Sequence, residues 1–287
     1  MDGMFKRVLF ATDLSRDCAR VFMGLAELKC MGMGHARILY VMDKDQEAEG
    51  FYDVEARANE ELAAKKDYLA ERGISVDAAV RAGEPAAEIL KCAREWGATL
   101  VIMGSTPRGA LGGLLVGSTA EDVVRGSGVP VFVERLAGGA VPEAHEGVCR
   151  VVPFGKVLVP LDFSDASLAV LGRVTKEMRV AAREVVLAHV VVGGWTQPGR
   201  LSLAEKAEAR LDGLAGGLSA EGLTVRTHVH DGHAAEEIIK IAAEEEAGLV
   251  AMSLHGGSGR LKEAVTGGTA MHVLHHSHVS VLVFPEA

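Results

Sequence analysis

Positive charge is scarce in this sequence. The 287 residues carry 30 lysines and arginines against 39 aspartates and glutamates, a formal net charge of -9. Neither a basic run nor a stripe that mixes basic with aromatic residues occurs. A surface that binds DNA or RNA needs such a basic footprint. The composition therefore disfavours a nucleic-acid partner.

Long apolar runs and paired cysteines are also missing. The apolar stretch 185–195 is too short to span a bilayer, and Asp13 interrupts the N-terminal stretch too early for a signal peptide. We therefore expect a cytoplasmic protein with no membrane partner. The four cysteines are dispersed with no Cys-x-x-Cys spacing, so we expect thiols and neither a disulfide framework nor a zinc knuckle.

The sequence does contain a long internal repeat. FKRVLFATDLSRDCARVF from Phe5 aligns with FGKVLVPLDFSDASLAVL from Phe154, an offset of 149 that places Asp13 on Asp162. GEPAAEILKCAREWGATLVIMG from Gly83 aligns at the same offset with GHAAEEIIKIAAEEEAGLVAMS from Gly232. After a glycine-rich loop the offset becomes 150. With 48% hydrophobic residues, each half can bury its own core. We predict domains at 1–135 and 154–287, joined by a Gly- and Pro-containing linker at 136–153.

Each copy alternates apolar strand patterns with helical patterns. In the first copy, strands are predicted at 7–12, 36–42, 74–81, 99–103 and 129–133. The predicted helices run from near Ser15 to about Lys29, over 52–72, from Pro85, and after the glycine-rich loop. This order predicts an α/β fold in which each half is a doubly wound, mostly parallel five-stranded sheet flanked by helices. Ligands of such sheets bind at the carboxyl ends of the strands.

The loop after the fourth strand is rich in glycine. It contains Gly104, Gly109, Gly112, Gly113 and Gly117 and ends at a helix that either Ser118 or Thr119 could cap. A backbone without Cβ atoms admits close approach, and the amides at a helix start attract anions. The loop is therefore a candidate phosphate site, although a flexible turn would have the same composition.

These features together resemble the universal stress protein family, and the resemblance covers nearly all of both halves. The family's adenine-nucleotide members share Gly-x2-Gly-x9-Gly-Ser/Thr after strand four, which reads Gly104-x2-Pro107-x9-Gly117-Ser118 here. The strand-one aspartate is Asp13, and the start of the third helix carries Gly83, Pro85 and Ile89. The resemblance implies a Rossmann-like, adenine nucleotide alpha hydrolase-like fold. It also implies a role in stress response and an ATP- or AMP-like ligand, with or without Mg²⁺.

The resemblance also implies a role for each matching residue. The backbone of Val41 would hold adenine. The Asp13 side chain and the Gly104 backbone would hold the ribose. The phosphates would meet the Gly117 and Ser118 amides and the Ser118 hydroxyl. Pro107 replaces a family glycine and therefore removes an amide donor. The Arg108 side chain, or the backbone amides of Arg108 and Gly109, could compensate for this loss. The full set of predicted nucleotide-binding residues in this copy is Thr12, Asp13, Val41, Gly104, Arg108, Gly109, Gly117, Ser118 and Thr119.

The second copy departs from the family pattern in a different way. Ser253 replaces the first glycine, and Gly268 stands in the register of Ser118. An alternative alignment pairs Gly268 and Thr269 with Gly117 and Ser118. The predicted nucleotide-binding residues in this copy are Asp162, Val190, Gly256, Gly267, Gly268 and Thr269.

Residues for efficient catalysis are absent from the loop. No Gly-x4-Gly-Lys-Ser/Thr sequence occurs, Arg108 is the only cation in the first loop, and no partnered base is evident. We therefore expect no catalytic residues, and slow ATPase activity or self-phosphorylation at most. Nucleotide occupancy would act as a signal or a stabiliser.

Two other function classes remain open. One is a metal site formed by the closely spaced His272, His275, His276 and His278, which would equally suit an exposed helix end. The other is an assembly module with degenerate sites, in which the two halves form an internal pseudo-dimer or the chain forms a homodimer. The apolar, β-branched fifth strands VPVFV and VSVLVF suit such pairing.

Overall fold

The computed structural model describes residues 3–15, 18–42, 51–105, 116–135, 154–192, 200–256 and 268–285. The chain divides into two compact units, Met1–Cys149 and Arg150–Ala287. The predicted linker at 136–153 lies outside the described residues, so the domain bounds drawn from the sequence stay a prediction.

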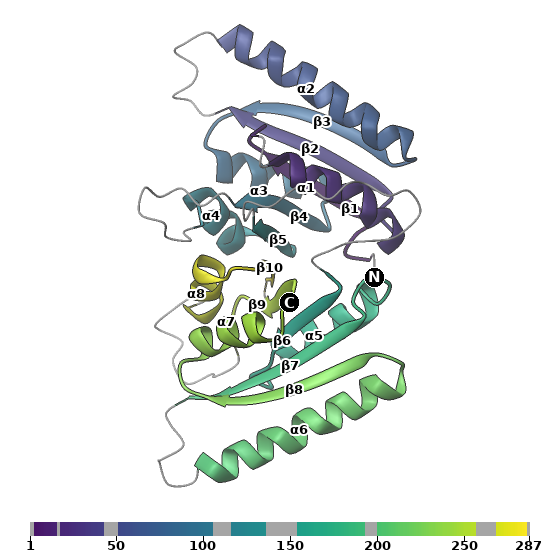
Figure 1. Ribbon diagram of the computed structural model, residues 1–287. Helices are drawn as coiled ribbons and strands as arrows, with labels where there is room; N and C mark the ends of the chain where they lie inside the picture. Colours follow the sequence, from purple (N-terminus) through teal and green to yellow (C-terminus); the bar gives the residue numbers. More distant parts are fainter. Residues whose placement is uncertain are drawn as a thin grey trace. The chain divides into compact units, whose positions relative to one another are not determined.

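The first unit alternates strands and helices along the chain (Figure 1). Its elements are β1 (Arg7–Thr12), α1 (Cys18–Leu25), the 3₁₀ helix η1 (Ala26–Met31), β2 (His35–Met42), α2 (Phe51–Glu71), β3 (Ser75–Ala82), α3 (Pro85–Trp96), β4 (Leu100–Ser105), α4 (Ser118–Gly126) and β5 (Val131–Arg135). The strand order in the sheet is β3-β2-β1-β4-β5, and each neighbouring pair is parallel.

The second unit has the same topology. Its elements are β6 (Lys156–Pro160), α5 (Asp165–Glu177), β7 (Glu184–Val191), α6 (Arg200–Ala220), β8 (Thr224–Asp231), α7 (Ala234–Glu244), β9 (Leu249–Ser253), α8 (Gly268–His276) and β10 (Ser280–Phe284). The strand order is β8-β7-β6-β9-β10, again parallel at each neighbouring pair. The prediction that each half is a doubly wound α/β unit with five parallel strands flanked by helices is confirmed.

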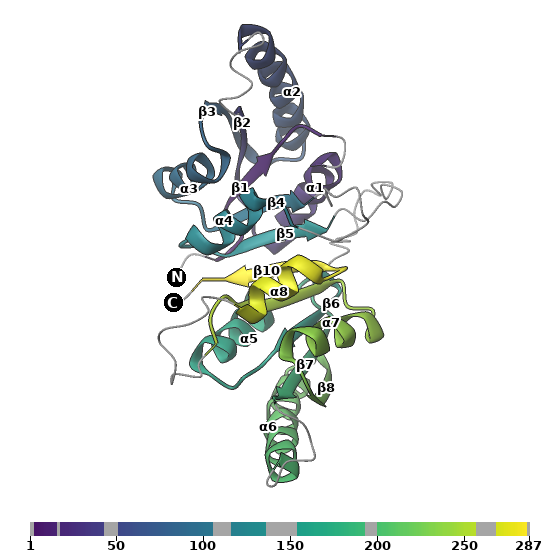
Figure 2. The same ribbon diagram turned by 90° about the vertical axis from the view of Figure 1, so that its left-hand side faces the viewer.

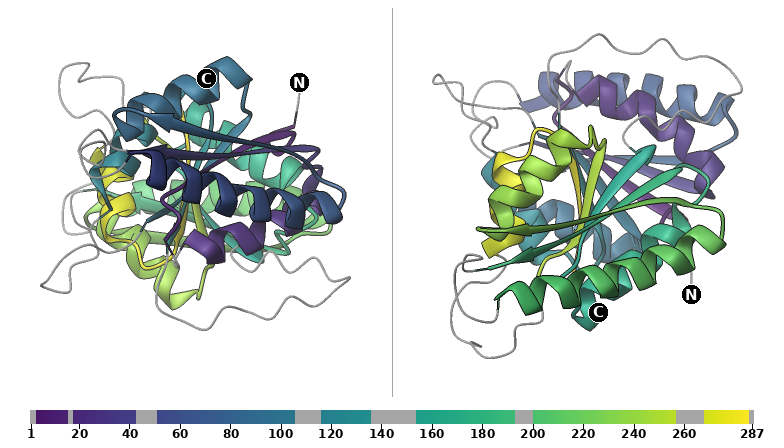
Figure 3. Two further views of the ribbon diagram at one scale, coloured as in Figure 1. Left: turned by 90° about the horizontal axis from the view of Figure 1, so that it is seen from above. Right: turned by 60° about the horizontal axis from the view of Figure 1, so that its bottom comes forward.

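Helices cover both faces of each sheet. In the first unit α3 and α4 lie side by side on one face, while α1 and α2 cover the opposite face (Figure 2). The long helices α2 and α6 run along the outer strands of their own sheets, β2 and β3 for α2 and β7 and β8 for α6 (Figure 3). Because right-handed crossovers reverse direction after the third strand, the helices divide between the two faces in this way. None of the helices in the described ranges has the length and apolar content that a bilayer crossing requires.

The central strands form because they are apolar over their whole length. Val8, Leu9 and Phe10 of β1 are fully buried, as expected for a parallel strand covered on both faces. The third helix begins as its sequence predicts, with Pro85 in the first turn. The Glu84 carboxylate accepts hydrogen bonds from the Ala86 and Ala87 amides at 3.0 and 2.6 Å.

Two local expectations were wrong. The helix predicted to reach Lys29 is α-helical only as far as Leu25 and continues as a 3₁₀ helix to Met31, where Gly32 ends it with a left-handed φ of 91°. The cysteines are not all thiols either. Cys18 and Cys92 are free and buried, whereas Cys30 is disulfide-bonded.

The strand register of the first unit aligns the carboxyl ends of three neighbouring strands. Thr12 of β1 lies opposite Tyr40 of β2, and Ala11 lies opposite Met103 of β4. The residues that follow these positions, among them Asp13, Val41 and Gly104, therefore meet at one edge of the sheet, where such folds bind ligands.

Candidate functional site

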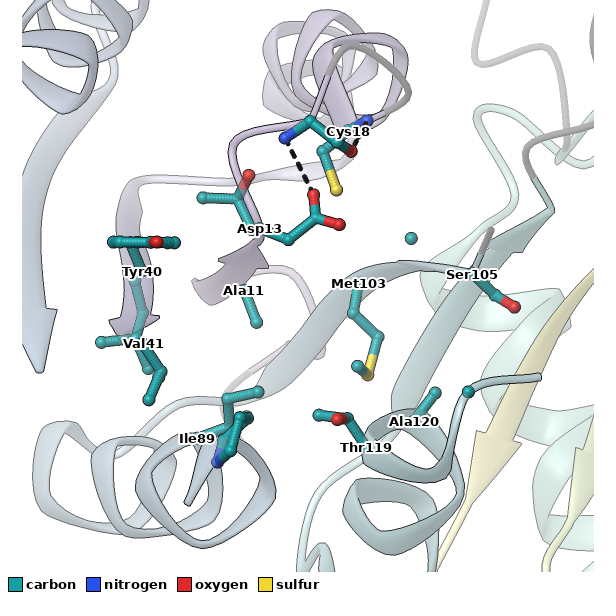
Figure 4. A pocket seen from close by; sticks show the side chains of 16 residues that line it. Ala11, Asp13, Cys18, Tyr40, Val41, Ile89, Met103, Ser105, Thr119 and Ala120 are labelled. Carbon is teal, nitrogen blue, oxygen red and sulfur yellow. Dashed lines mark hydrogen bonds between the residues drawn. The ribbon is translucent and has the colours of Figure 1, made fainter. Parts of the chain in front are cut away.

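A cavity of about 430 Å³ lies at this carboxyl edge of the first unit (Figure 4). The ends of β1, β2 and β4 form its walls together with the first turns of α3 and α4. The lining residues are Ala11, Thr12, Asp13, Ser15, Cys18, Leu39, Tyr40, Val41, Pro85, Ile89, Met103, Gly104, Ser105, Gly117, Thr119 and Ala120. Its size falls within the range of small-molecule sites.

The structure brings together most of the residues predicted for this copy. The predicted residues that line the cavity are Thr12, Asp13, Val41, Gly104, Gly117 and Thr119. Ser118 begins α4 next to the cavity but is exposed and does not line it. Pro107, Arg108 and Gly109 lie outside the described residues. Among the lining residues that the structure describes, none is a lysine or an arginine.

The turn after β1 fixes the position of Asp13. Its Oδ1 atom accepts a hydrogen bond from the Ser15 amide at 2.9 Å, and Thr12 Oγ1 accepts one from the Leu14 amide at 3.0 Å. Leu14 adopts a left-handed φ of 58°, which is uncommon for a residue with a side chain. Two side-chain acceptors hold this turn, which keeps the exposed Asp13 carboxylate at the mouth of the cavity.

The start of α4 provides main-chain donors at the other side of the cavity. Gly117 is the N-cap residue, with φ -65° and ψ 150°, and no side chain caps the helix. The expectation that Ser118 or Thr119 would cap it was therefore wrong. Since a helix leaves its first amides without intrahelical acceptors, the amide of Thr119, which lines the cavity, can donate a hydrogen bond to an anion there.

The sulfur and phenol groups of the cavity are neutral near neutral pH. Burial raises the pKa of the Cys18 thiol to about 11, and the nearby Asp13 carboxylate contributes to this shift. Burial, followed by the charges of Asp13 and Glu61, also raises the pKa of Tyr40. Asp13 is therefore the main source of charge among the described lining residues.

Several lining residues were not singled out from the sequence. Tyr40 and Met103 directly precede predicted site residues at the ends of β2 and β4, so strand register would have identified them. Ser105 was missed because β4 extends two residues beyond the predicted strand end. Cys18 was missed because the position of α1 relative to the sheet carries no local sequence signal.

The second unit brings its own aspartate and glycine together. Asp162 Oδ1 accepts hydrogen bonds from the Ser164 amide at 3.0 Å and the Ser164 hydroxyl at 2.6 Å. A Cβ atom added at Gly256 would lie 2.7 Å from Asp162 Oδ2, so the absence of a side chain at Gly256 allows this approach. Asp162 and Gly256 are thus neighbours, as an equivalent site would require.

The remaining positions of the second unit follow the first alignment. Helix α8 begins at Gly268 and α4 at Ser118, an offset of 150. The hydroxyls of Ser127 and Ser277, also 150 apart, each donate to a carbonyl two residues later. Gly268 and Thr269 therefore occupy the positions of Ser118 and Thr119, and both are exposed. Gly267 lies outside the described residues.

The strand ends of the second unit carry different side chains from those of the first. Val190 is half-buried in β7, and the preceding residue is His189, where the first unit has Tyr40. The His189 ring stacks on Phe163 with centroids 4.7 Å apart, and its Nδ1 atom donates to the Leu161 carbonyl at 2.7 Å. The two units therefore share a backbone plan but differ in the residues at the strand ends.

In the described residues, His272, His275, His276 and His278 are not placed as a group of three or more metal ligands. His276 stacks on His272 at a centroid distance of 4.2 Å and donates from Nδ1 to the His272 carbonyl at 2.9 Å. Across the ranges that the structure describes, no group of three or more His, Cys, Asp or Glu side chains is placed to hold a metal ion. The metal hypothesis thus gains no support from the geometry.

Comparison with known proteins places both halves of the chain in one family. The Universal stress protein family matches residues 4–135 and 153–285. Universal stress protein MJ0577 of Methanocaldococcus jannaschii is 27% identical over 155 residues, covering 46% of this chain and 95% of that protein. Universal stress protein Mb2028c of Mycobacterium bovis is 28% identical over 231 residues, covering 79% of this chain and 74% of that protein.

A solved structure supports the same fold. The crystal structure of a universal stress protein from Archaeoglobus fulgidus superposes with a TM-score of 0.71 at 24% identity, covering 99% of each chain. At that identity the likeness concerns the fold alone. Because the family pattern matches both halves over nearly their whole length, the chain belongs to the universal stress protein family and carries two such domains.

Proposed function

We propose that the first unit binds an adenine nucleotide in the cavity at the carboxyl edge of its sheet, as part of a stress response. One observation carries the proposal. Six residues singled out from four separate stretches of sequence converge on one cavity of about 430 Å³. The sheet topology brings the strand ends to one edge, and the cavity at that edge gives a ligand access to all six residues.

The chemistry of the cavity suits the parts of a nucleotide. Met103, Ile89 and Val41 provide apolar surface for a base, with the Val41 backbone available for hydrogen bonds. The Asp13 carboxylate at the mouth accepts hydrogen bonds from ribose hydroxyls. Phosphate oxygens would meet the amides at the start of α4, where the helix dipole also favours negative charge.

The proposed role of the nucleotide is to be held, with its occupancy serving as a signal or a stabiliser. Phosphoryl transfer requires several positive charges around the transferring group. The described lining residues include no lysine or arginine, so slow ATPase activity or self-phosphorylation is the most that we propose. A ligand at a hundred times its dissociation constant stabilises the folded state by about 2.7 kcal/mol, which makes stabilisation a measurable effect.

The test is to identify what the purified protein carries and what it takes up. Acid extraction followed by anion-exchange chromatography should release adenine nucleotide from freshly purified protein. Thermal unfolding should shift upward on adding ATP, ADP or AMP, with and without Mg²⁺. If the extract contains no nucleotide and none of ATP, ADP and AMP changes the melting temperature, the proposal is wrong and a pure assembly module is favoured.

The proposal also covers how the two halves assemble and where in the cell the protein works. We propose that the two halves form an internal pseudo-dimer, with a homodimer as the further option, and that the protein works in the cytoplasm. Light scattering coupled to size exclusion measures the mass in solution, and a mass of one chain would exclude the homodimer.

A further inference from the structure

A buried arginine stands next to the cavity without lining it. Arg135 is the last residue of β5, and only 9% of its surface is exposed. It lies opposite Ser105 in the strand register, and its Nη1 atom donates to Ser105 Oγ at 3.4 Å. Ser105 is 3% exposed and does line the cavity. The guanidinium is therefore separated from the cavity by one side chain.

This arrangement brings positive charge and a directed donor to one place. Burial lowers the pKa of Arg135 to about 10, so the guanidinium remains charged near neutral pH. A guanidinium only donates hydrogen bonds, whereas a serine hydroxyl both donates and accepts. Because Ser105 Oγ accepts from Arg135, its own proton is available for another acceptor. The pair thus favours an acceptor that carries negative charge.

The position of Ser105 identifies which part of a ligand it would meet. In Figure 4, Ser105 and Ala120 lie at the end of the cavity opposite Tyr40 and Val41. Tyr40 and Val41 mark the proposed base end, and Ala120 belongs to the first turn of α4. The buried cation is therefore at the end where the helix amides would meet phosphate.

We infer that Arg135, acting through Ser105, makes this end of the cavity selective for the phosphate groups of its ligand. It would thereby distinguish nucleotides from nucleosides. The inference rests on the proposed function and adds a specificity-determining residue to it. The second copy has Pro285 in the corresponding register, so its site has no equivalent cation at this position. Arg135 is then one reason for the two halves to differ in ligand preference.

The wild-type protein supplies the first test, by calorimetric titration with ADP and with adenosine. We expect ADP to bind at least about tenfold more tightly, because a charged hydrogen-bond network is worth an order of magnitude or more in affinity. Equal affinities would overturn the inference and leave the proposed function intact. Binding of neither compound would instead remove the proposed function itself.

Variants then test the residue. Arg135→Met should weaken ADP binding about tenfold and change adenosine binding by less than about twofold, while Arg135→Lys should retain most of the ADP preference. Arg94→Met, which removes an exposed cation from the far end of α3, is the matched control and should change neither. If Arg135→Met does not fold, Ser105→Ala serves instead and should weaken the binding of ADP but not that of adenosine. An equal loss of ADP and adenosine in these variants contradicts the inference.

Discussion

The Asp13 carboxylate accepts a hydrogen bond from the Ser15 amide at 2.9 Å, and Asp162 has the same relationship to the Ser164 amide at 3.0 Å. Each aspartate therefore closes a turn after the first strand of its unit. Both turns also place a left-handed residue next, Leu14 in one and Phe163 in the other. This equivalence provides a matched pair of variants.

Asp13→Ala should reduce nucleotide affinity by about ten- to a hundredfold, because a hydrogen bond to a charged group contributes about 1.5 to 3 kcal/mol. Asp162→Ala removes the same turn from the second unit and should leave that affinity unchanged. Titration calorimetry of both variants with ADP measures the difference. A loss in Asp162→Ala with retention in Asp13→Ala would move the site to the second unit.

The Cys18 thiol should resist alkylation in the folded protein. Burial raises its pKa from 9.0 to about 11, and only the thiolate is alkylated efficiently. Between those two pH values, iodoacetamide should modify Cys18 much more slowly in the native protein than in urea, with Cys18→Ala identifying the signal. Rapid native labelling near neutral pH would contradict the burial of this thiol.

The same shift makes stability depend on alkaline pH. The folded-state pKa of Cys18 lies above the unfolded value of 9.0. The contribution of the neutral thiol to the free energy of unfolding is therefore fully present below pH 9.0 and is lost as the pH rises towards 11. Wild-type protein should therefore lose more stability than Cys18→Ala over this interval, as measured by urea unfolding.

Gly256→Ala should destabilise the second unit. The new Cβ atom would lie 2.7 Å from Asp162 Oδ2, so the carboxylate must move and its two bonds to Ser164 weaken, at a cost of about 1 to 2 kcal/mol. Gly217→Ala in α6 meets no atom within 4 Å and should stabilise the helix by about 0.5 to 1 kcal/mol. Thermal unfolding compares the two. If both variants change the melting temperature in the same direction and by a similar amount, the contact between Gly256 and Asp162 is absent in solution.

Glu245 should stabilise the second unit in a pH-dependent way. It pairs with His228 Nε2 at 2.8 Å, Arg226 Nη1 at 3.2 Å and Lys156 Nζ at 3.4 Å. Burial opposes its ionisation, but these partners together lower the pKa of Glu245 below 4.5. The charged form therefore contributes stability near neutral pH that is lost as the pH falls through the lowered folded-state value.

Glu245→Gln should consequently cost about 1 to 3 kcal/mol near neutral pH, and the difference from wild type should shrink in acid. Glu221→Gln breaks an exposed pair with Arg179 and should cost less than about 0.5 kcal/mol. Urea unfolding across the acidic range checks both variants. A deficit for Glu245→Gln that stays constant with pH would rule out the ionic explanation.

The sequence by itself determined the architecture of this protein. The repeat at an offset of 149 identified two equivalent halves, and continuous apolar strands such as β1 and β4 predicted parallel sheets covered on both faces. Asp13, Val41 and Gly104 could be assigned to one edge because strand direction follows from the alternation of strands and helices. These features depend on periodicity and on the order of segments along the chain, both of which can be read from the sequence without the fold.

Only the tertiary structure decided which side chains complete the site. Ser105 meets Arg135 across 30 residues of sequence, and Asp162 meets Gly256 through the packing of separate loops. Gly117, rather than a hydroxyl residue, is the N-cap of α4 because the path of the chain into the helix sets the capping position. Such contacts depend on strand register and on how far each strand extends, and a shift of one residue turns every side chain to the other face.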